Sequence, residues 1–425
     1  MKKRGRWLLG SLFVATFVMG AAPVYGSAPG ALDNSFGRGG IVQTTFSNIG
    51  AGVVLFQSNG DIVVVAANAN PTSVAVESIA VIRFLPNGAV DTSFGTQGIT
   101  IFAFANAPRD YSSTTSAALQ SDGKIVVLGL WQHELESSTE DEVGIARLNT
   151  NGTLDTTFGQ NGLVTLGSIG SASGITTPTA LLLQSDGKIL VAASVNGCAI
   201  GCSAQTAFVR LNPNGTLDST FGQDGTDVIS VYGGSPDILA ELTTGDLLTY
   251  SRNVIAQYSP SGALRPQVTG GTRLATSTSN SSGDVIQPDG KVLISVTVSG
   301  RTYQNFVNQL IRFLPTSDVD WGFQNPPFPS FVGSAVEPDN EDIVVVAQAP
   351  PSFTAIKLLR FNPDGSVDTS FGNGGTVLTS IAGGSASPNL VAIQPNGSIL
   401  VAGSFTPSGS QTSVMILARY LHLAH

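Results

Sequence analysis

The chain has 425 residues, of which 42% are hydrophobic and only 12% are charged, and its formal net charge is −9. The hydrophobic fraction can build a large core, which excludes a disordered chain. An acidic surface repels phosphate backbones, so nucleic acid is not expected as a partner.

Residues 1–26 have the pattern of a secretory signal peptide. Four cations precede an apolar stretch that runs to about Ala22, and a cleavage site ends at Gly26. A retained membrane anchor is the alternative, but the apolar stretch is shorter than the ~20 residues that a spanning helix needs. Removal of four cations and no anions moves the net charge from −9 to −13. We expect a mature chain without a membrane span, secreted or periplasmic, and monomeric.

The sequence holds only two cysteines, Cys198 and Cys202, in the run Cys-Ala-Ile-Gly-Cys. An oxidising compartment favours a disulfide between them, and a four-residue offset allows one only in a turn. A metal or redox pair is the alternative, but no His or further Cys lies nearby in the sequence.

Three sequence landmarks recur in a fixed order along the chain. The first is an apolar strand, a Gln-x-Asp/Asn-Gly turn and a second apolar strand; its copies lie at Gln57, Gln120, Gln184, Gln287, Glu337 and Gln394, with a worn copy at 243–245. The second is a strand that ends in Arg followed by a Pro/Asn-Gly turn; its copies lie at Arg83, Arg147, Arg210, Arg312, Arg360 and Arg419, with a degenerate copy at Gln257. The third is Leu/Val-Asp-x-x-Phe-Gly-x-x-Gly; its copies are marked by Phe36, Phe94, Phe158, Phe221 and Phe371, with an altered copy at Trp321 and a nearly erased one near Leu264.

Each landmark occurs seven times, so the chain is a repeat protein and not a set of independent domains. Residues 27–425 number 399, which gives 57 residues for each of seven units. Each unit contains four strand-sized runs, A to D, and this period predicts an all-β, seven-bladed β-propeller with four antiparallel strands per blade. The mature chain begins with a lone third landmark and ends with strands A, B and C. The N-terminal segment should therefore supply strand D of the C-terminal blade and close the ring.

The turn residues have physical roles in this fold. Pro presets φ for a turn, Gly accepts the positive φ that follows, and the recurring Phe should wedge between neighbouring blades. The Asp after each turn should hydrogen-bond the next bend. A calcium loop is the alternative at Asn362, Asp364 and Asp368, but the closing Glu and the alternating acidic positions are missing.

Loop variety is concentrated on one face of the predicted ring. The A–B and C–D turns are short and uniform, whereas the B–C and D–A connections, on the opposite face, vary in length and composition. Binding loops are expected on the variable face. The B–C connection of the second unit combines an aromatic, a His and carboxylates; its candidate binding residues are Trp131, His133, Glu134 and Glu136. A solvated acidic loop is the alternative.

The quoted units, such as LQSDGKILVAAS with FVRLNPNGTLDSTFGQDG, resemble the delta-60 repeat, a β-propeller repeat of unknown function in exported bacterial proteins. The resemblance covers essentially the whole mature chain and implies a propeller in a bacterial surface or secreted setting. It implies no catalytic residues. The landmarks erode at 241–283 and 312–325, so those blades should be irregular or face a partner.

No catalytic, cofactor or metal residues are predicted, because no His–carboxylate cluster, nucleophile elbow or zinc spacing occurs. The sequence favours a secreted, non-catalytic binding or scaffold propeller that contacts a protein or glycan through the variable face. The alternative is a secreted lyase or hydrolase with a site at the channel mouth, because fold alone does not decide function.

Overall fold

The protein is known from a computed structural model, which describes residues 28–47, 49–68, 78–104, 111–134, 139–167, 169, 175–196, 205–230, 238–251, 254–265, 273–276, 285–287, 289–299, 306–315, 318–328, 330–349 and 354–422. These residues form 27 strands, β1 to β27, in seven sheets. The predicted signal peptide and both cysteines lie outside the described residues. The part of the chain that the structure describes contains no apolar helix of bilayer-spanning length.

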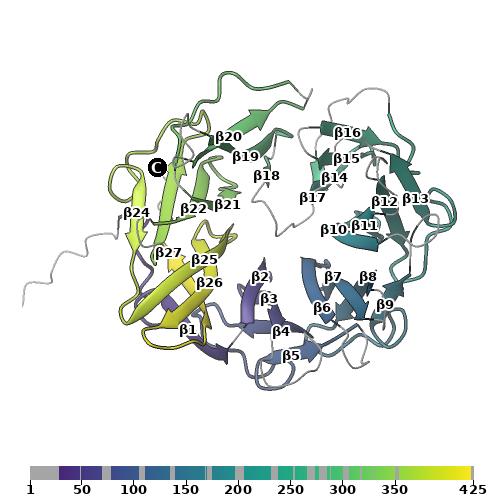
Figure 1. The fold of residues 1–425 in the computed structure, drawn as a ribbon, viewed down its shortest axis with the longest axis horizontal. Coiled ribbons are helices and arrows are strands. Elements are labelled where there is room, and N and C mark those ends of the chain that lie inside the picture. Colours follow the sequence, from purple (N-terminus) through teal and green to yellow (C-terminus); the bar gives the residue numbers. More distant parts are fainter. Residues whose placement is uncertain are drawn as a thin grey trace, which may run out of the picture.

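The seven sheets are arranged as the blades of a ring (Figure 1). Blade 1 contains β2 (Ile49–Phe56), β3 (Ile62–Asn68), β4 (Ser78–Phe84) and β5 (Ile99–Phe102). Blade 2 contains β6 (Tyr111–Leu119), β7 (Ile125–Glu134), β8 (Thr139–Leu148) and β9 (Leu163–Leu166). Blade 3 contains β10 (Ile175–Leu183), β11 (Ile189–Asn196), β12 (Gln205–Leu211) and β13 (Thr226–Ser230).

The remaining strands form the other four blades. Blade 4 contains β14 (Ile238–Leu242), β15 (Leu247–Ser251), β16 (Val254–Tyr258) and β17 (Arg273–Thr276). Blade 5 contains β18 (Val285–Ile286), β19 (Val292–Ser299) and β20 (Phe306–Phe313). Blade 6 contains β21 (Phe331–Val336), β22 (Ile343–Gln348), β23 (Ile356–Phe361) and β24 (Thr376–Thr379). Blade 7 contains β25 (Gly384–Ile393), β26 (Ile399–Pro407), β27 (Val414–Tyr420) and β1 (Ile41–Ser47).

The predicted seven-bladed propeller is therefore confirmed. Every strand pairing is antiparallel, and in the regular blades strand A lies on the inner side of the ring and strand D on the outer side (Figure 1). The middle strands are rich in Val, Ile and Leu because both of their faces are covered by neighbouring blades. In β3, for example, the five residues from Ile62 onward are all buried.

Seven apolar clusters hold the ring together, and each one joins two neighbouring blades. The first combines Val63 and Val65 of blade 1 with Ile125 and Val127 of blade 2. Burial of such a side chain contributes about 1.5–3 kcal/mol. Seven interfaces for seven blades leave no open end in the ring.

The ring closes as the sequence predicted, by pairing of β1 with β27. Ile41 lies opposite Ala418 in an antiparallel ladder. The chain ends also rebuild the C–D turn that blade 7 lacks. The backbone N–H of Gly30 donates to the carbonyl of Leu421 at 2.9 Å, and the N–H of Leu421 donates to the carbonyl of Ala31 at 2.8 Å.

The continuous turn of blade 1 has the same two hydrogen bonds, from Gly88 to Leu85 and from Leu85 to Ala89, each at 2.8 Å. Gly88 has a φ of +85° and Gly30 has a φ of +81°. Residues with side chains rarely adopt this conformation, so both turns need glycine. The seam is thus an ordinary turn assembled from two chain segments.

Blades 4 and 5 depart from the regular pattern, as the eroded landmarks predicted. In blade 4, β17 pairs with the inner strand β14 and not with the outer strand β16. In blade 5 the sheet has three strands in the described residues, and the place of strand D is taken by one bridge between Asn308 and Phe328. Pro326 and Pro327 precede Phe328 and have no N–H, which prevents a longer ladder.

Candidate functional site: the groove between the first two blades

Each regular blade carries an arginine, an aspartate and a phenylalanine that pack as one cluster beneath the uniform turns. In blade 2, Nε of Arg147 donates to Oδ2 of Asp155 at 2.8 Å, and its guanidinium lies 4.6 Å from the centre of the Phe158 ring. Arg147, Asp155 and Phe158 are all buried. Six blades have the cation over the ring; the pairs are Arg83–Phe94, Arg147–Phe158, Arg210–Phe221, Arg312–Phe323, Arg360–Phe371 and Arg419–Phe36.

Five of these six arginines tie neighbouring blades together through Nη1. Arg83 donates to the carbonyl of Thr150 in blade 2 at 2.6 Å, and Arg419 of blade 7 donates to the carbonyl of Pro86 in blade 1 at 2.6 Å. Arg147, Arg210 and Arg312 make the equivalent bonds to Pro213, Pro260 and Pro363. These arginines are structural, because their hydrogen bonds are used within the ring.

The pKa is lowered for the cluster aspartates Asp33, Asp91, Asp155, Asp218 and Asp368. Burial alone would raise the pKa of Asp218, but hydrogen bonds from the hydroxyl and N–H of Thr220 and the charge of Arg210 outweigh it and lower the pKa to about 2. Burial alone would also raise the pKa of Asp155. Hydrogen bonds from Thr157 and Lys124 outweigh this effect and lower the pKa of Asp155 well below its usual range. The predicted hydrogen bond from Asp to the following bend is confirmed by these contacts.

The carboxylates considered for calcium are occupied by protein donors. Oδ1 of Asp364 accepts from the N–H and the hydroxyl of Ser366, and Asp368 pairs with Arg360 at 2.6 Å. Within the described ranges no three His, Cys, Asp or Glu side chains meet as a metal-binding group.

Blade 4 contains the cluster with its charges rearranged. Gln257 replaces the arginine, and Arg265 stands eight residues later, where the regular blades have aspartate. The anion is instead Asp246 of the A–B turn, which accepts from Nε2 of Gln257 and from Nη2 of Arg265, each at 2.8 Å. Compared with the regular blades, both the cation and the anion of the cluster are therefore supplied from different sequence positions.

Blade 6 has a second variation, at its interface with blade 7. Glu337 replaces the glutamine of the first landmark, and Oε1 of Glu337 lies 3.4 Å from Nη1 of the fully buried Arg360. Nδ1 of His422, which stands where the other blades have Pro or Thr, lies 2.9 Å from Oε2 of Glu337. Two simultaneous replacements thus bring a histidine and a carboxylate together at the seam.

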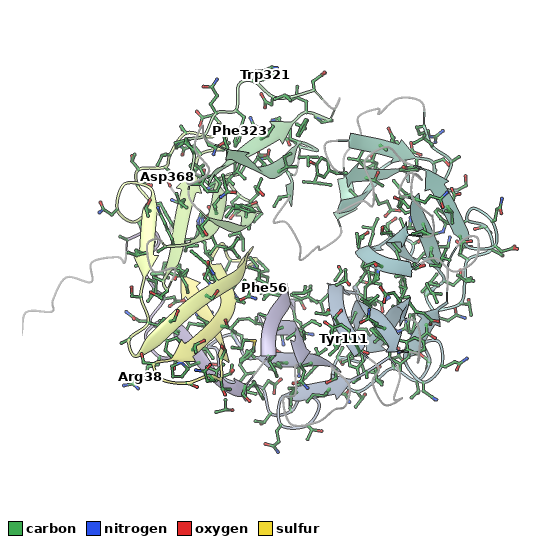
Figure 2. All side chains as sticks on the ribbon, viewed as in Figure 1. Arg38, Phe56, Tyr111, Trp321, Phe323 and Asp368 are labelled. Atoms are coloured by element: carbon green, nitrogen blue, oxygen red, sulfur yellow. The ribbon has the colours of Figure 1, made fainter. Side chains whose placement is uncertain are left out.

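A groove of about 510 Å³ opens between blades 1 and 2 on the face of the uniform turns. Its two walls are equivalent A–B turns, and its lining residues are Phe56, Gln57, Ser58, Asn59, Arg83, Leu119, Gln120, Ser121, Asp122, Gly123 and Thr150. Phe56, at the end of β2, lies on the inner side of the ring (Figure 2). The volume is within the range of about 300–1,000 Å³ that ligand pockets have.

A replacement in the A–B turn of blade 1 accompanies this groove. In blades 2 and 3 a lysine of the A–B turn extends to the cluster aspartate, with Nζ of Lys124 3.0 Å from Asp155 and Nζ of Lys188 3.5 Å from Asp218. Blade 1 has the shorter Asp61 at this position, so no such chain extends over Arg83. Between blades 3 and 4 the corresponding turns are linked, because Glu241 accepts from the N–H of Ser185 at 2.7 Å.

The charges around the groove are already neutralised by the protein. Nε and Nη2 of Arg83 contact Oδ2 of Asp91 at 2.7 Å. Asp122 lies 3.7 Å from Nζ of Lys124. The groove therefore offers a ligand mainly amides, hydroxyls and two apolar side chains, Phe56 and Leu119.

The residues that the sequence singled out lie on the other face. Trp131, His133 and Glu134 are at the end of β7. In the backbone ladder between β7 and β8, His133 lies opposite Glu140 and Glu134 lies opposite Thr139. Glu136 lies outside the described residues, as do Cys198 and Cys202, so the binding loop and the disulfide stay predictions. The enzyme with a channel-mouth site also stays a prediction.

Sequence reasoning did not find the groove. A signal was present: aligned by their landmarks, the units show Asp61 where three others have lysine, and Thr150 where five others have proline. The groove lies between two blades, however, and its width depends on how the two blades pack, which the sequence of a single unit does not show.

Five segments of the chain match the family described as domain of unknown function (DUF5122) beta-propeller; they are residues 57–94, 120–158, 184–221, 352–371 and 394–421. These matches and the seven-bladed fold support a β-propeller family of unknown function. A search of curated proteins found no match.

Three solved structures are similar to this chain at low sequence identity. A protein of unknown function from Dyadobacter fermentans is 10% identical, with 90% of this chain and 100% of that chain covered and a TM-score of 0.43. A Trypanosoma rangeli sialidase mutant with trans-sialidase activity is 10% identical, with 89% and 59% covered and a TM-score of 0.40. An N-acetylgalactosamine deacetylase from F. plautii is 10% identical, with 92% and 94% covered and a TM-score of 0.37. Likeness at this level carries no argument about activity.

Proposed function

We propose that the chain is an exported, non-catalytic binding propeller, which holds a protein or glycan ligand in the groove between blades 1 and 2. The observation that carries the proposal is the groove itself, with about 510 Å³ and two walls of hydrogen-bonding side chains. Concave sites that combine apolar surface with a few polar groups are the usual ligand sites of proteins.

The chemistry of the lining favours binding over catalysis. Arg83 and Asp122 are both paired with protein charges. A general acid or base needs a group that can exchange a proton with the substrate, and the nucleophilic hydroxyls of Ser58 and Ser121 lie on exposed turns without an adjacent His in the groove lining.

A bulky residue in one wall tests the site. Ser121 is exposed, and Pro338 and Pro395 stand at the same turn position in other units, so the turn tolerates replacement. We expect Ser121→Trp to fill the groove and abolish ligand capture on an array of oligosaccharides and peptides. Ser185→Trp is the matched control, because Ser185 is the equivalent exposed residue of blade 3 and does not line the groove. Equal capture by both variants would refute the groove as the site.

Export is the second part of the proposal and rests on the sequence of residues 1–26. Expression of the full chain in a bacterium should yield a mature protein that begins at Ser27 and is found outside the cytoplasm. Intact-mass measurement of the fractionated protein checks both points. An uncleaved cytoplasmic chain would contradict export and leave the groove proposal untouched. The variable-loop face remains the alternative contact surface.

A further inference from the structure

We infer that the ligand of this groove is an uncharged oligosaccharide, an inference that rests on the proposed function and names its ligand class. The two walls repeat the same sequence of groups, because Phe56-Gln57-Ser58-Asn59 and Leu119-Gln120-Ser121-Asp122 occupy equivalent turns. Equivalent walls present similar donors and acceptors on both sides of the ligand.

Side-chain amides and hydroxyls dominate this surface. Gln57 and Gln120 each carry an amide, and Ser58 and Ser121 each carry a hydroxyl that can both donate and accept. Part of this set is used within the protein: Nδ2 of Asn59 donates to Asp61 at 2.8 Å, Oδ1 of Asn59 accepts from the N–H of Asp61 at 3.1 Å, and Oε1 of Gln57 accepts from Nη1 of Arg83 at 3.5 Å. Sugar hydroxyls have the same double capacity, so each can bond an amide on two sides. The apolar C–H face of a sugar ring fits the aromatic face that Phe56 supplies.

An acidic ligand is disfavoured by the state of Arg83. Its Nε and Nη2 contact Asp91 at 2.7 Å, and its Nη1 donates to the carbonyl of Thr150 at 2.6 Å. A carboxylate or phosphate in the groove would have to break these bonds or stay unpaired in a partly dry site, which is costly.

An extended peptide is disfavoured by the state of the turn backbones. Peptides that add to a protein in strand form need free backbone N–H and C=O groups. Here the N–H groups of Gln57 and Gly60 bond within their turn at 2.9 Å, and the N–H groups of Gln120 and Gly123 do the same at 2.9 Å. The groove therefore presents side chains to its ligand and not a strand edge.

Gln120 provides the sharpest test. Its Oε1 is buried without a hydrogen-bond partner, and the same is true of Oε1 at the equivalent Gln184, Gln287 and Gln394; Gln394, in blade 7, does not line the groove. Gln120→Met keeps the length of the side chain and removes its amide. Gln394→Met makes the same change away from the site and is the matched control.

The probes are neutral oligosaccharides of glucose, mannose and galactose and an acidic oligogalacturonide, observed by saturation-transfer NMR and titration calorimetry. We expect binding of at least one neutral oligosaccharide, weakened about tenfold by Gln120→Met, as for the loss of one hydrogen bond, and lost in Ser121→Trp. Gln394→Met and Ser185→Trp should bind as the parent does.

Two results overturn the inference and are distinguishable from failure of the proposed function. Capture of only the acidic probe or of a peptide, sensitive to Ser121→Trp, would refute a neutral sugar ligand while the groove stays a binding site. Absence of any signal from the neutral panel at millimolar concentration would also refute it. Binding that Ser121→Trp leaves unchanged would instead refute the groove as the site.

Discussion

Blades 3 and 4 contain the same kind of charged cluster with opposite placement of the charges. In blade 3 the cation is Arg210 at the end of β12, and it pairs with Asp218 at 2.7 Å. In blade 4 the cation is Arg265, at the position equivalent to Asp218, and it pairs with Asp246 at 2.8 Å. The repeat therefore conserves a neutral, hydrogen-bonded cluster and not particular residues at particular positions.

The two clusters differ in how firmly they tie the ring. Arg210 also bonds the carbonyl of Pro260 in the next blade and lies 4.5 Å from the ring of Phe221. The side chain of Arg265 is 45% exposed, whereas that of Arg210 is 7% exposed. The cluster of blade 3 should therefore contribute much more to the stability of the fold than the cluster of blade 4 does.

The largest expected effect is the loss of the buried arginine of blade 3. Arg210→Ala leaves Asp218 buried without its main partner, and breaking one side of a buried ion pair costs about 3–5 kcal/mol. Gln257→Ala, at the same position of blade 4, removes a neutral hydrogen-bond donor to Asp246 and leaves the pairing of Asp246 with Arg265 in place, so it should cost about 1 kcal/mol. Guanidinium unfolding followed by tryptophan fluorescence measures both. Equal midpoints for the two variants would contradict the difference between the blades.

The exchange of charges in blade 4 can be reversed in two steps. Arg265→Asp alone places two carboxylates beside each other and removes the cation that pairs with Asp246, so it should destabilise strongly. Gln257→Arg alone adds a second cation beside Arg265. Together the two changes restore the arrangement of blade 3, so we expect a favourable coupling of about 1–3 kcal/mol in a double-mutant cycle. Additive effects would show that the two positions act independently.

How far the sequence predicts this molecule can be judged from the same two blades. The turn motif around Gln184 and the strand before Arg210 repeat often enough to give the blade count and the closure by β1. Arg210 lies near the end of β12, and Asp218 lies eight residues later in the connection to β13, so the strand period of two does not reveal their pairing. Blade 4 is harder still, because the erosion of its landmarks predicted irregularity but not the pairing of β17 with the inner strand β14.

A smaller effect is expected from acid, and it should arise in blade 3. The pKa of Asp218 is lowered to about 2 from an ordinary value of 3.8, because hydrogen bonds and the charge of Arg210 outweigh burial. A carboxyl with a lowered pKa stabilises the fold above its unfolded-state pKa, and this contribution is lost as the pH falls from about 4 to about 2. Between pH 5 and pH 2 the melting temperature should therefore fall more steeply with decreasing pH in the parent than in Asp218→Asn.

The control for the acid experiment is Asp339→Asn, which removes an equal charge from an exposed turn in blade 6. In Asp339→Asn the melting temperature should fall between pH 4 and pH 2 about as steeply as in the parent. If Asp218→Asn retained the parent's slope, the cluster would not be the source of the acid sensitivity.

The smallest effect separates the two turn residues at one repeat position, Lys188 in blade 3 and Asp246 in blade 4. Nζ of Lys188 lies 3.5 Å from Asp218, but Arg210 already pairs with that carboxylate, and the lysine is partly exposed. Lys188→Ala should therefore cost only about 0.2–1 kcal/mol, and less in 1 M salt, which screens exposed charges. Asp246→Ala removes the acceptor that Gln257 and Arg265 share and should cost several times more. Calorimetric melting of both variants at low and high salt measures the difference. A large, salt-independent loss in Lys188→Ala would mean that blade 3 needs a second cation, and the two clusters would then differ in composition and not only in placement.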